Sequence, residues 1–182
     1  MLRITIPAVK ERWDEINEVF LEGTEEVTLE LEHSLVSLSK WESKWCVPFL
    51  SKRDKTTEEV IDYIKCMTIT KDVPDYIYEN LTEVNFKCIS SYIEAPMSAT
   101  WFSEDKMRRP SRETVTSELI YYWMIALNIP MECQYWHLNR LMTLIKVCNI
   151  KNTPPKKMGR RELMNRNAAL NASRRQRFNS RG

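Results

Sequence analysis

Residues 111–150 constrain the fold most strongly, because large apolar and aromatic side chains are densest there and recur at helical spacing. Steps of three and four predict two helices that each bury one side. The first stripe is Val115, Leu119, Tyr122, Trp123 and Ala126, and the second is Met131, Tyr135, Leu138, Met142 and Ile145. Ser111 is the expected N-cap.

The segment Asn128-Ile129-Pro130 lies between the two stripes. Proline lacks the amide that a helix interior needs but fits a first helical turn, so this segment ends one helix and starts the next. The sequence therefore predicts a helical hairpin with other elements packed over it. The aromatic residues in it suit a core better than a ligand site, and His137 is expected to be a hydrogen-bonded structural residue.

The N-terminal third has the alternation of β-strands. Apolar residues alternate with polar ones over 2–6 and again over 27–31, with an apolar run at 19–21 between them. These patterns predict a small antiparallel sheet. Helices should follow, with Ser34, either Thr56 or Thr57, and Thr82 as N-caps and a short helix after Pro74. The segment 95–102 lacks this helical periodicity and is expected to be extended.

Motifs of catalysis or cofactor binding are missing from the sequence. Only three glycines are present, so the sequence contains neither a glycine-rich phosphate-binding loop nor a dinucleotide fingerprint. No serine lies in a Gly-x-Ser-x-Gly elbow. The five cysteines are widely spaced and the two histidines are far apart, which argues against a structural zinc site and favours reduced, mostly buried thiols. We expect a non-enzymatic protein without a cofactor or metal.

Charge is divided unevenly along the chain. Residues 151–182 contain ten basic residues and one acidic residue, a net charge of +9, whereas the other 150 residues have 17 basic and 24 acidic residues, a net charge of −7. The double proline at 154–155 separates the two parts. The sequence predicts a single globular domain over 1–150, with a sheet part at 1–33 and a helical part at 34–150, and a basic, helix-capable extension over 151–182.

The basic extension is the clearest candidate binding segment that charge alone identifies. One interpretation is binding to nucleic acid through phosphate contacts, although only Phe178 is available for base stacking. Another is docking to an acidic protein, including the acidic body of a second copy, and a third is a solvated tail. The candidate partner-binding residues are Lys156, Lys157, Arg160, Arg161, Arg166, Arg174, Arg175 and Arg177.

Four long stretches carry a family resemblance. They are LEHSLVSLSKWESKW at 31–45, YIKCMT at 63–68, APMSATWF at 95–102, and SELIYYWMIALNIPMECQYWHLNRLMTLIKVCNIKN followed by PPKKMGRRELMNRNAALNASRR. Through them the chain resembles the tail assembly chaperones of long-tailed bacteriophages with non-contractile tails.

The resemblance implies a non-enzymatic protein of the host bacterial cytoplasm. Its copies would bind the tape-measure protein, keep this long helical protein soluble, and transfer it to tail-tube subunits. Self-association through acidic body and basic tail is a further expectation, and no membrane partner is expected because neither an apolar span nor a signal-peptide core is present. The alternatives are a structural virion protein of the neck, tail or baseplate, and a nucleic-acid-binding protein that acts through its basic tail.

These observations predict the α+β class with mostly helical content. A small N-terminal antiparallel sheet should pack on a helical core that contains the hairpin 111–150, and a basic helical extension should follow. The 182-residue chain is long enough to bury such a core without disulfides or metals.

Overall fold

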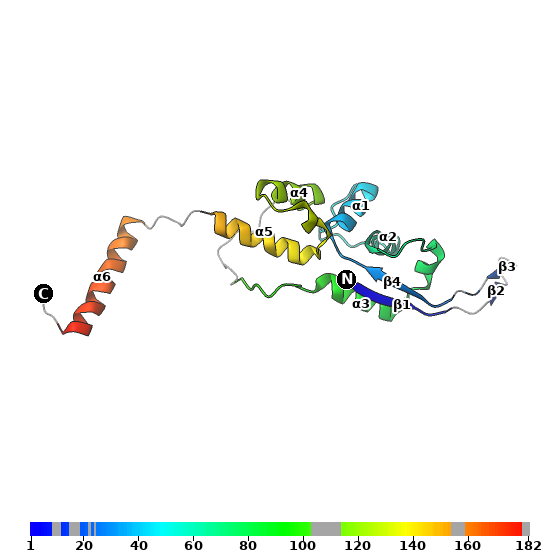
Figure 1. Ribbon diagram of the computed structural model, residues 1–182, viewed down its shortest axis with the longest axis horizontal. Helices are drawn as coiled ribbons and strands as arrows, with labels where there is room; N and C mark the ends of the chain where they lie inside the picture. The colour runs from blue at the N-terminus through cyan, green and yellow to red at the C-terminus, as the bar shows by residue number, and fades with distance from the viewer. Residues whose placement is uncertain are drawn as a thin grey trace. The chain divides into compact units, whose positions relative to one another are not determined.

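The N-terminal alternation forms the predicted sheet. In the computed structural model, β1 (Leu2–Ile6) pairs antiparallel with β4 (Val27–Leu31), and β2 (Arg12–Asp14) pairs antiparallel with β3 (Val19–Leu21) in a separate two-stranded sheet (Figure 1). The structure describes residues 1–8, 12–14, 19–21, 23, 25–102, 114–153 and 159–179. Contacts divide the chain into two units, Met1–Asn149 and Ile150–Gly182.

The β1–β4 pair has one apolar and one charged face, as its sequence period requires. Four side chains from the two strands are buried in the core: Ile4, Ile6, Leu29 and Leu31. On the other face, Arg3 lies opposite Glu30 and forms an ion pair with it at 2.7 Å. A mostly helical fold with a small antiparallel sheet packed on helices is thus confirmed.

The first helix, α1 (Leu35–Trp45), lies at the centre of the core. Ser34 caps it by accepting a hydrogen bond from the Ser37 amide, and Leu35, Leu38 and Trp41 are completely buried. It packs against α2, α4 and η2. The hairpin region 111–150 supplies Ile120, Met124 and Leu141 to the same core, so its predicted place in the core is confirmed, although it also keeps large side chains exposed.

Two further helices flank the sheet. Thr56 caps α2 (Thr57–Met67), the 3₁₀ helix η1 (Asp75–Asn80) follows Pro74, and Thr82 caps α3 (Glu83–Glu94). The predicted caps are thus confirmed, with Thr56 rather than Thr57 at α2. Side-chain Nδ2 of Asn85 donates to the Thr5 carbonyl, which ties α3 to β1.

The hairpin region contains three elements: α4 (Ser117–Ala126), the 3₁₀ helix η2 (Met131–Tyr135) and α5 (Leu138–Asn152). Thr116 caps α4, and the predicted cap Ser111 lies outside the described residues. Asn128 adopts a left-handed conformation (φ 52°) after α4, so the predicted break before Pro130 is confirmed.

The predicted buried stripes are only partly correct. In α4 the buried apolar residues are Ile120 and Met124, whereas Tyr122 and Ala126 are exposed. In the second half Leu138 and Ile145 are buried as predicted, but Met131 and Tyr135 belong to η2 and are exposed. The prediction of mostly buried thiols is wrong, because only Cys133 is buried, whereas Cys66 and Cys148 are partly buried and Cys46 and Cys88 are exposed.

Residues of the second unit form α6 (Arg160–Phe178), a helix that ends at Asn179 in a left-handed conformation. Every side chain of α6 for which burial is described is exposed. A helix of this kind has no buried face of its own, so it depends on intrinsic propensity or on a partner for its stability.

Candidate interaction surfaces

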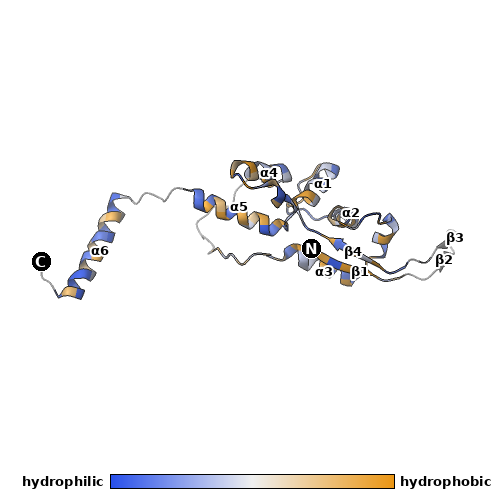
Figure 2. Ribbon diagram, viewed as in Figure 1, coloured by the Kyte–Doolittle hydropathy of each residue, from blue (hydrophilic) through white to orange (hydrophobic). Residues whose placement is uncertain are grey.

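Two adjoining elements expose large apolar side chains to solvent. Tyr122 and Ile125 of α4 are 63% and 67% exposed, and Met131 and Tyr135 of η2 are 45% and 64% exposed. The hydroxyl of Tyr121 donates a hydrogen bond to Oε1 of Gln134 at 3.0 Å, which links the two elements. We call these four side chains the α4–η2 face. Figure 2 shows orange, apolar segments on α4, whereas α6 is coloured mainly blue for hydrophilic residues.

The sequence contained a signal for this face. Residues 119–127 are all apolar or aromatic, so apolar side chains surround the helix and one buried side cannot accommodate them. The excess must either be covered by further elements of the chain or remain available to a partner. The predicted stripes correspond to the first alternative, because they place Tyr122, Met131 and Tyr135 in the core.

The basic residues predicted as a binding segment fall into two groups. Lys156 and Lys157 lie outside the described residues, and the six arginines lie on α6 with exposed side chains: Arg160, Arg161, Arg166, Arg174, Arg175 and Arg177. At about 100° per residue, the arginines are distributed around the helix rather than along one face. The helix is thus a positively charged rod with arginine clusters at its two ends.

His33 and His137 come together although they are far apart in sequence. Their rings pack edge to face with centroids 5.1 Å apart. Nδ1 of His33 shares a 2.5 Å hydrogen bond with the Tyr63 hydroxyl, and Nε2 of His137 is 3.0 Å from the Tyr92 carbonyl oxygen. The predicted structural role of His137 is therefore confirmed.

Electrostatics favour neutral rings at this pair. Burial, and then the neighbouring His137, lower the pKa of His33 to about 4. Burial also lowers the pKa of His137. Burial raises the pKa of Tyr63, which keeps its hydroxyl protonated. The group joins the end of β4, α2, α3 and the start of α5 through neutral hydrogen bonds.

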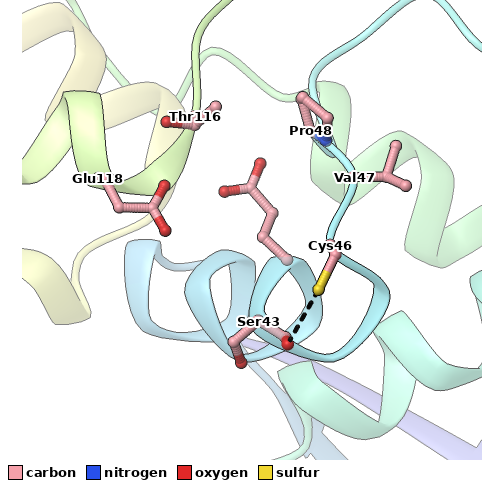
Figure 3. A pocket seen from close by; sticks show the side chains of 7 residues that line it. Ser43, Cys46, Val47, Pro48, Thr116 and Glu118 are labelled. Atoms are coloured by element: carbon pink, nitrogen blue, oxygen red, sulfur yellow. Dashed lines mark hydrogen bonds between the residues drawn. The ribbon is translucent and has the colours of Figure 1, made fainter.

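A polar pocket of about 330 Å³ lies between the end of α1 and the start of α4. Figure 3 shows Cys46, Thr116 and Glu118 around this space. Its buried carboxylate belongs to Glu42, whose oxygens accept from the Phe49 amide at 2.8 Å and the Ser117 amide at 2.7 Å. Glu42 thus joins two chain segments, which explains its burial without a bound ligand.

A search of the described residues for groups of three or more potential metal ligands finds none. Among the described helices, none has the length and apolarity needed to cross a membrane. Comparisons with protein-family models, curated proteins and solved structures find no match to this chain. The α4–η2 face and α6 are the two exposed surfaces on which the proposed function is based.

Proposed function

We propose that this chain is a non-enzymatic tail assembly chaperone of a long-tailed bacteriophage. It binds the tape-measure protein, covers the apolar helical surface of that protein, and releases it to tail-tube subunits. The observation that carries the proposal is the α4–η2 face, which leaves Tyr122, Ile125, Met131 and Tyr135 exposed. The family resemblance of four long sequence stretches supports the same role.

The composition of this face suits a helical client. Tyrosine and methionine are enriched at protein interfaces, tyrosine because it combines a large apolar ring with a polar tip and methionine because its unbranched side chain adapts to irregular surfaces. Amphipathic helices bind to such surfaces through apolar residues at steps of three and four. A long helical protein offers this pattern many times, so several copies could bind along it.

The test is co-purification of the tagged chain with the tape-measure protein from phage-infected cells, with nuclease in the wash. The double variant Tyr122→Ser, Ile125→Ser should recover at least about tenfold less tape-measure protein, because it removes two interface anchors. Val84→Ser is the matched control, since Val84 and Ile125 are both 67% exposed. Equal recovery by the double variant and the wild type would refute the role of this face.

A second candidate is nucleic-acid binding, favoured by the exposed arginines of α6. Such binding releases counterions from phosphates, so affinity should fall steeply between about 50 and 200 mM salt. Titration of labelled double-stranded DNA and single-stranded RNA with the full chain and with a truncation after Thr153 tests it. Binding that is weak, or that survives the truncation, excludes α6 as a nucleic-acid site.

The same helix could join copies of the chain, because its positive charge complements the acidic body. Contact between different surfaces on successive copies produces an open array, which is suitable for covering a long client. Light scattering should then give a larger mass for the full chain than for the truncation, and a mass that falls with salt. Monomeric mass for both proteins would refute self-association.

A further inference from the structure

A second cavity, of about 270 Å³, is lined by residues of α2, α3 and the segment before α2. Its walls are mainly apolar and include Phe49, Val60, Ile64, Phe86, Ile89 and Ile93. Phe49, Ile64 and Ile89 are buried core residues, whereas Val60, Phe86 and Ile93 are only partly buried. The cavity therefore connects the core to the molecular surface between two helices. We call it the α2–α3 groove.

Lys55 is the charged residue among those that line the groove. Its ammonium nitrogen lies 4.4 Å from the centroid of the Phe49 ring. Among the described residues, no carboxylate lies within ion-pair distance of it, and the neighbouring Glu59 is paired with Arg53. Burial, followed by the nearby Arg53, lowers the pKa of Lys55, while Glu59 and Asp54 raise it by less, so an added carboxylate would further stabilise its charged form.

The volume of the groove and the chemistry of its lining indicate what kind of partner it could bind. The volume of about 270 Å³ is near the lower end of small-molecule sites, which are about 300–1,000 Å³, and the mainly apolar wall suits an apolar side chain of a partner protein. An apolar wall beside a single cation complements a helix with an apolar anchor and a carboxylate one turn away, because residues three or four apart lie on the same helix face.

We infer that the α2–α3 groove binds an amphipathic helix of a partner protein, with an apolar side chain in the cavity and a carboxylate paired with Lys55. The inference rests on the proposed function, because it assigns this helix to the tape-measure protein. The groove and the α4–η2 face draw residues from different helices, so one copy presents two surfaces for a helical client. This arrangement would fix the direction of a client helix on each copy.

Two adjacent serines allow a sharp test. Ser90 lines the groove from α3 and is exposed, whereas Ser91 is exposed and does not line it. Ser90→Trp should fill the cavity from the surface and lower the affinity for the tape-measure protein by about tenfold or more, while Ser91→Trp should leave it within about twofold. Both positions are exposed, so both variants should fold, which thermal unfolding verifies.

Charge reversal gives a second, independent test. Lys55→Glu should weaken binding by about tenfold, whereas Lys87→Glu, an exposed reversal on α3 outside the groove, should have little effect. The probes are the tape-measure protein of the same phage and a labelled synthetic peptide. The peptide has 18 residues, with leucines at steps of three and four and a glutamate one turn from the central leucine. A second peptide carries lysine in place of that glutamate.

The outcomes separate the two proposals. Tape-measure binding that is unchanged by Ser90→Trp and Lys55→Glu overturns the groove and leaves the chaperone role standing. Peptide binding that depends on its glutamate and on both residues, without any tape-measure binding, supports the groove and overturns the chaperone role. Failure of both probes to bind the wild-type chain overturns both proposals.

Discussion

The imidazole rings of His33 and His137 pack edge to face at 5.1 Å between centroids, and together they join two parts of the chain that are more than a hundred residues apart. The carbonyl of His33 also accepts the Leu138 amide at 2.7 Å, where α5 begins. Because both rings are stabilised in the neutral form, the pair links folding to pH.

Stability should fall as the pH decreases from about 6.5 to about 4. The unfolded chain protonates His33 near its ordinary pKa of 6.5, whereas the folded protein does so only near 4. The unfolded state therefore binds more protons in this window, and His33 accounts for at most about 3 kcal/mol. Urea unfolding at several pH values measures the slope. In His33→Gln the slope over this window should be smaller, and an unchanged slope would contradict the assignment.

Trp41→Phe should destabilise the protein by about 1–3 kcal/mol. The Trp41 indole is completely buried and its N–H donates to the Glu59 carbonyl at 2.9 Å, so the variant keeps an aromatic ring but loses this buried hydrogen bond and part of the packed volume. Chemical unfolding measures the change. Trp101→Phe is the control, because Trp101 is 89% exposed and its replacement should alter stability by less than about 0.5 kcal/mol.

Alanine substitutions of the neighbouring α4 residues Met124 and Ile125 should change the free energy of unfolding by very different amounts. Met124→Ala should cost about 2–5 kcal/mol because it leaves a cavity beside completely buried side chains. Ile125→Ala should change the free energy of unfolding by less than about 0.5 kcal/mol, since that side chain is largely exposed. Thermal and urea unfolding compare the two. Equal losses would mean that the buried side of α4 is assigned wrongly.

Glu42→Gln should lower stability by about 1–3 kcal/mol. Both Glu42 oxygens accept backbone amides, and the glutamine NH₂ group would place a donor against one of those donors. Glu118→Gln is a matched change on the same pocket with an exposed side chain, and should have little effect on unfolding. A similar loss in both variants would point to charge rather than to the two hydrogen bonds.

Removal of α6 should leave the unfolding of the first unit unchanged. The described α6 side chains are exposed and α6 belongs to a separate unit, so truncation after Thr153 removes no core residue. We expect the Tm of the truncated protein to lie within about 2 °C of the full chain. A peptide of residues 159–179 should be only partly helical by circular dichroism, because a helix of this length is marginal alone. A large fall in Tm would show that α6 contributes to the core.

Elements whose signals are local could be predicted from the amino-acid sequence. The two strands of the β1–β4 sheet alternate clearly because their outer residues are polar, and a wrong register would bury charges such as Arg3 and Glu30. Ser34, Thr56 and Thr82 cap their helices through hydrogen bonds to amides three residues on, which neighbouring residues alone decide. The division of charge between an acidic body and a basic C-terminal extension also follows directly from the sequence.

Which apolar residues are buried, and which polar groups pair, depends on long-range packing. Residues of α4 are apolar on every side, so helical spacing fits several faces, and contact with α1 selects Ile120 and Met124. Glu42 meets the Ser117 amide across 75 residues, and the partners of His33 and His137 come from separate helices. No local pattern encodes such pairs, because their free energy depends on burial that exists only after the whole core has formed.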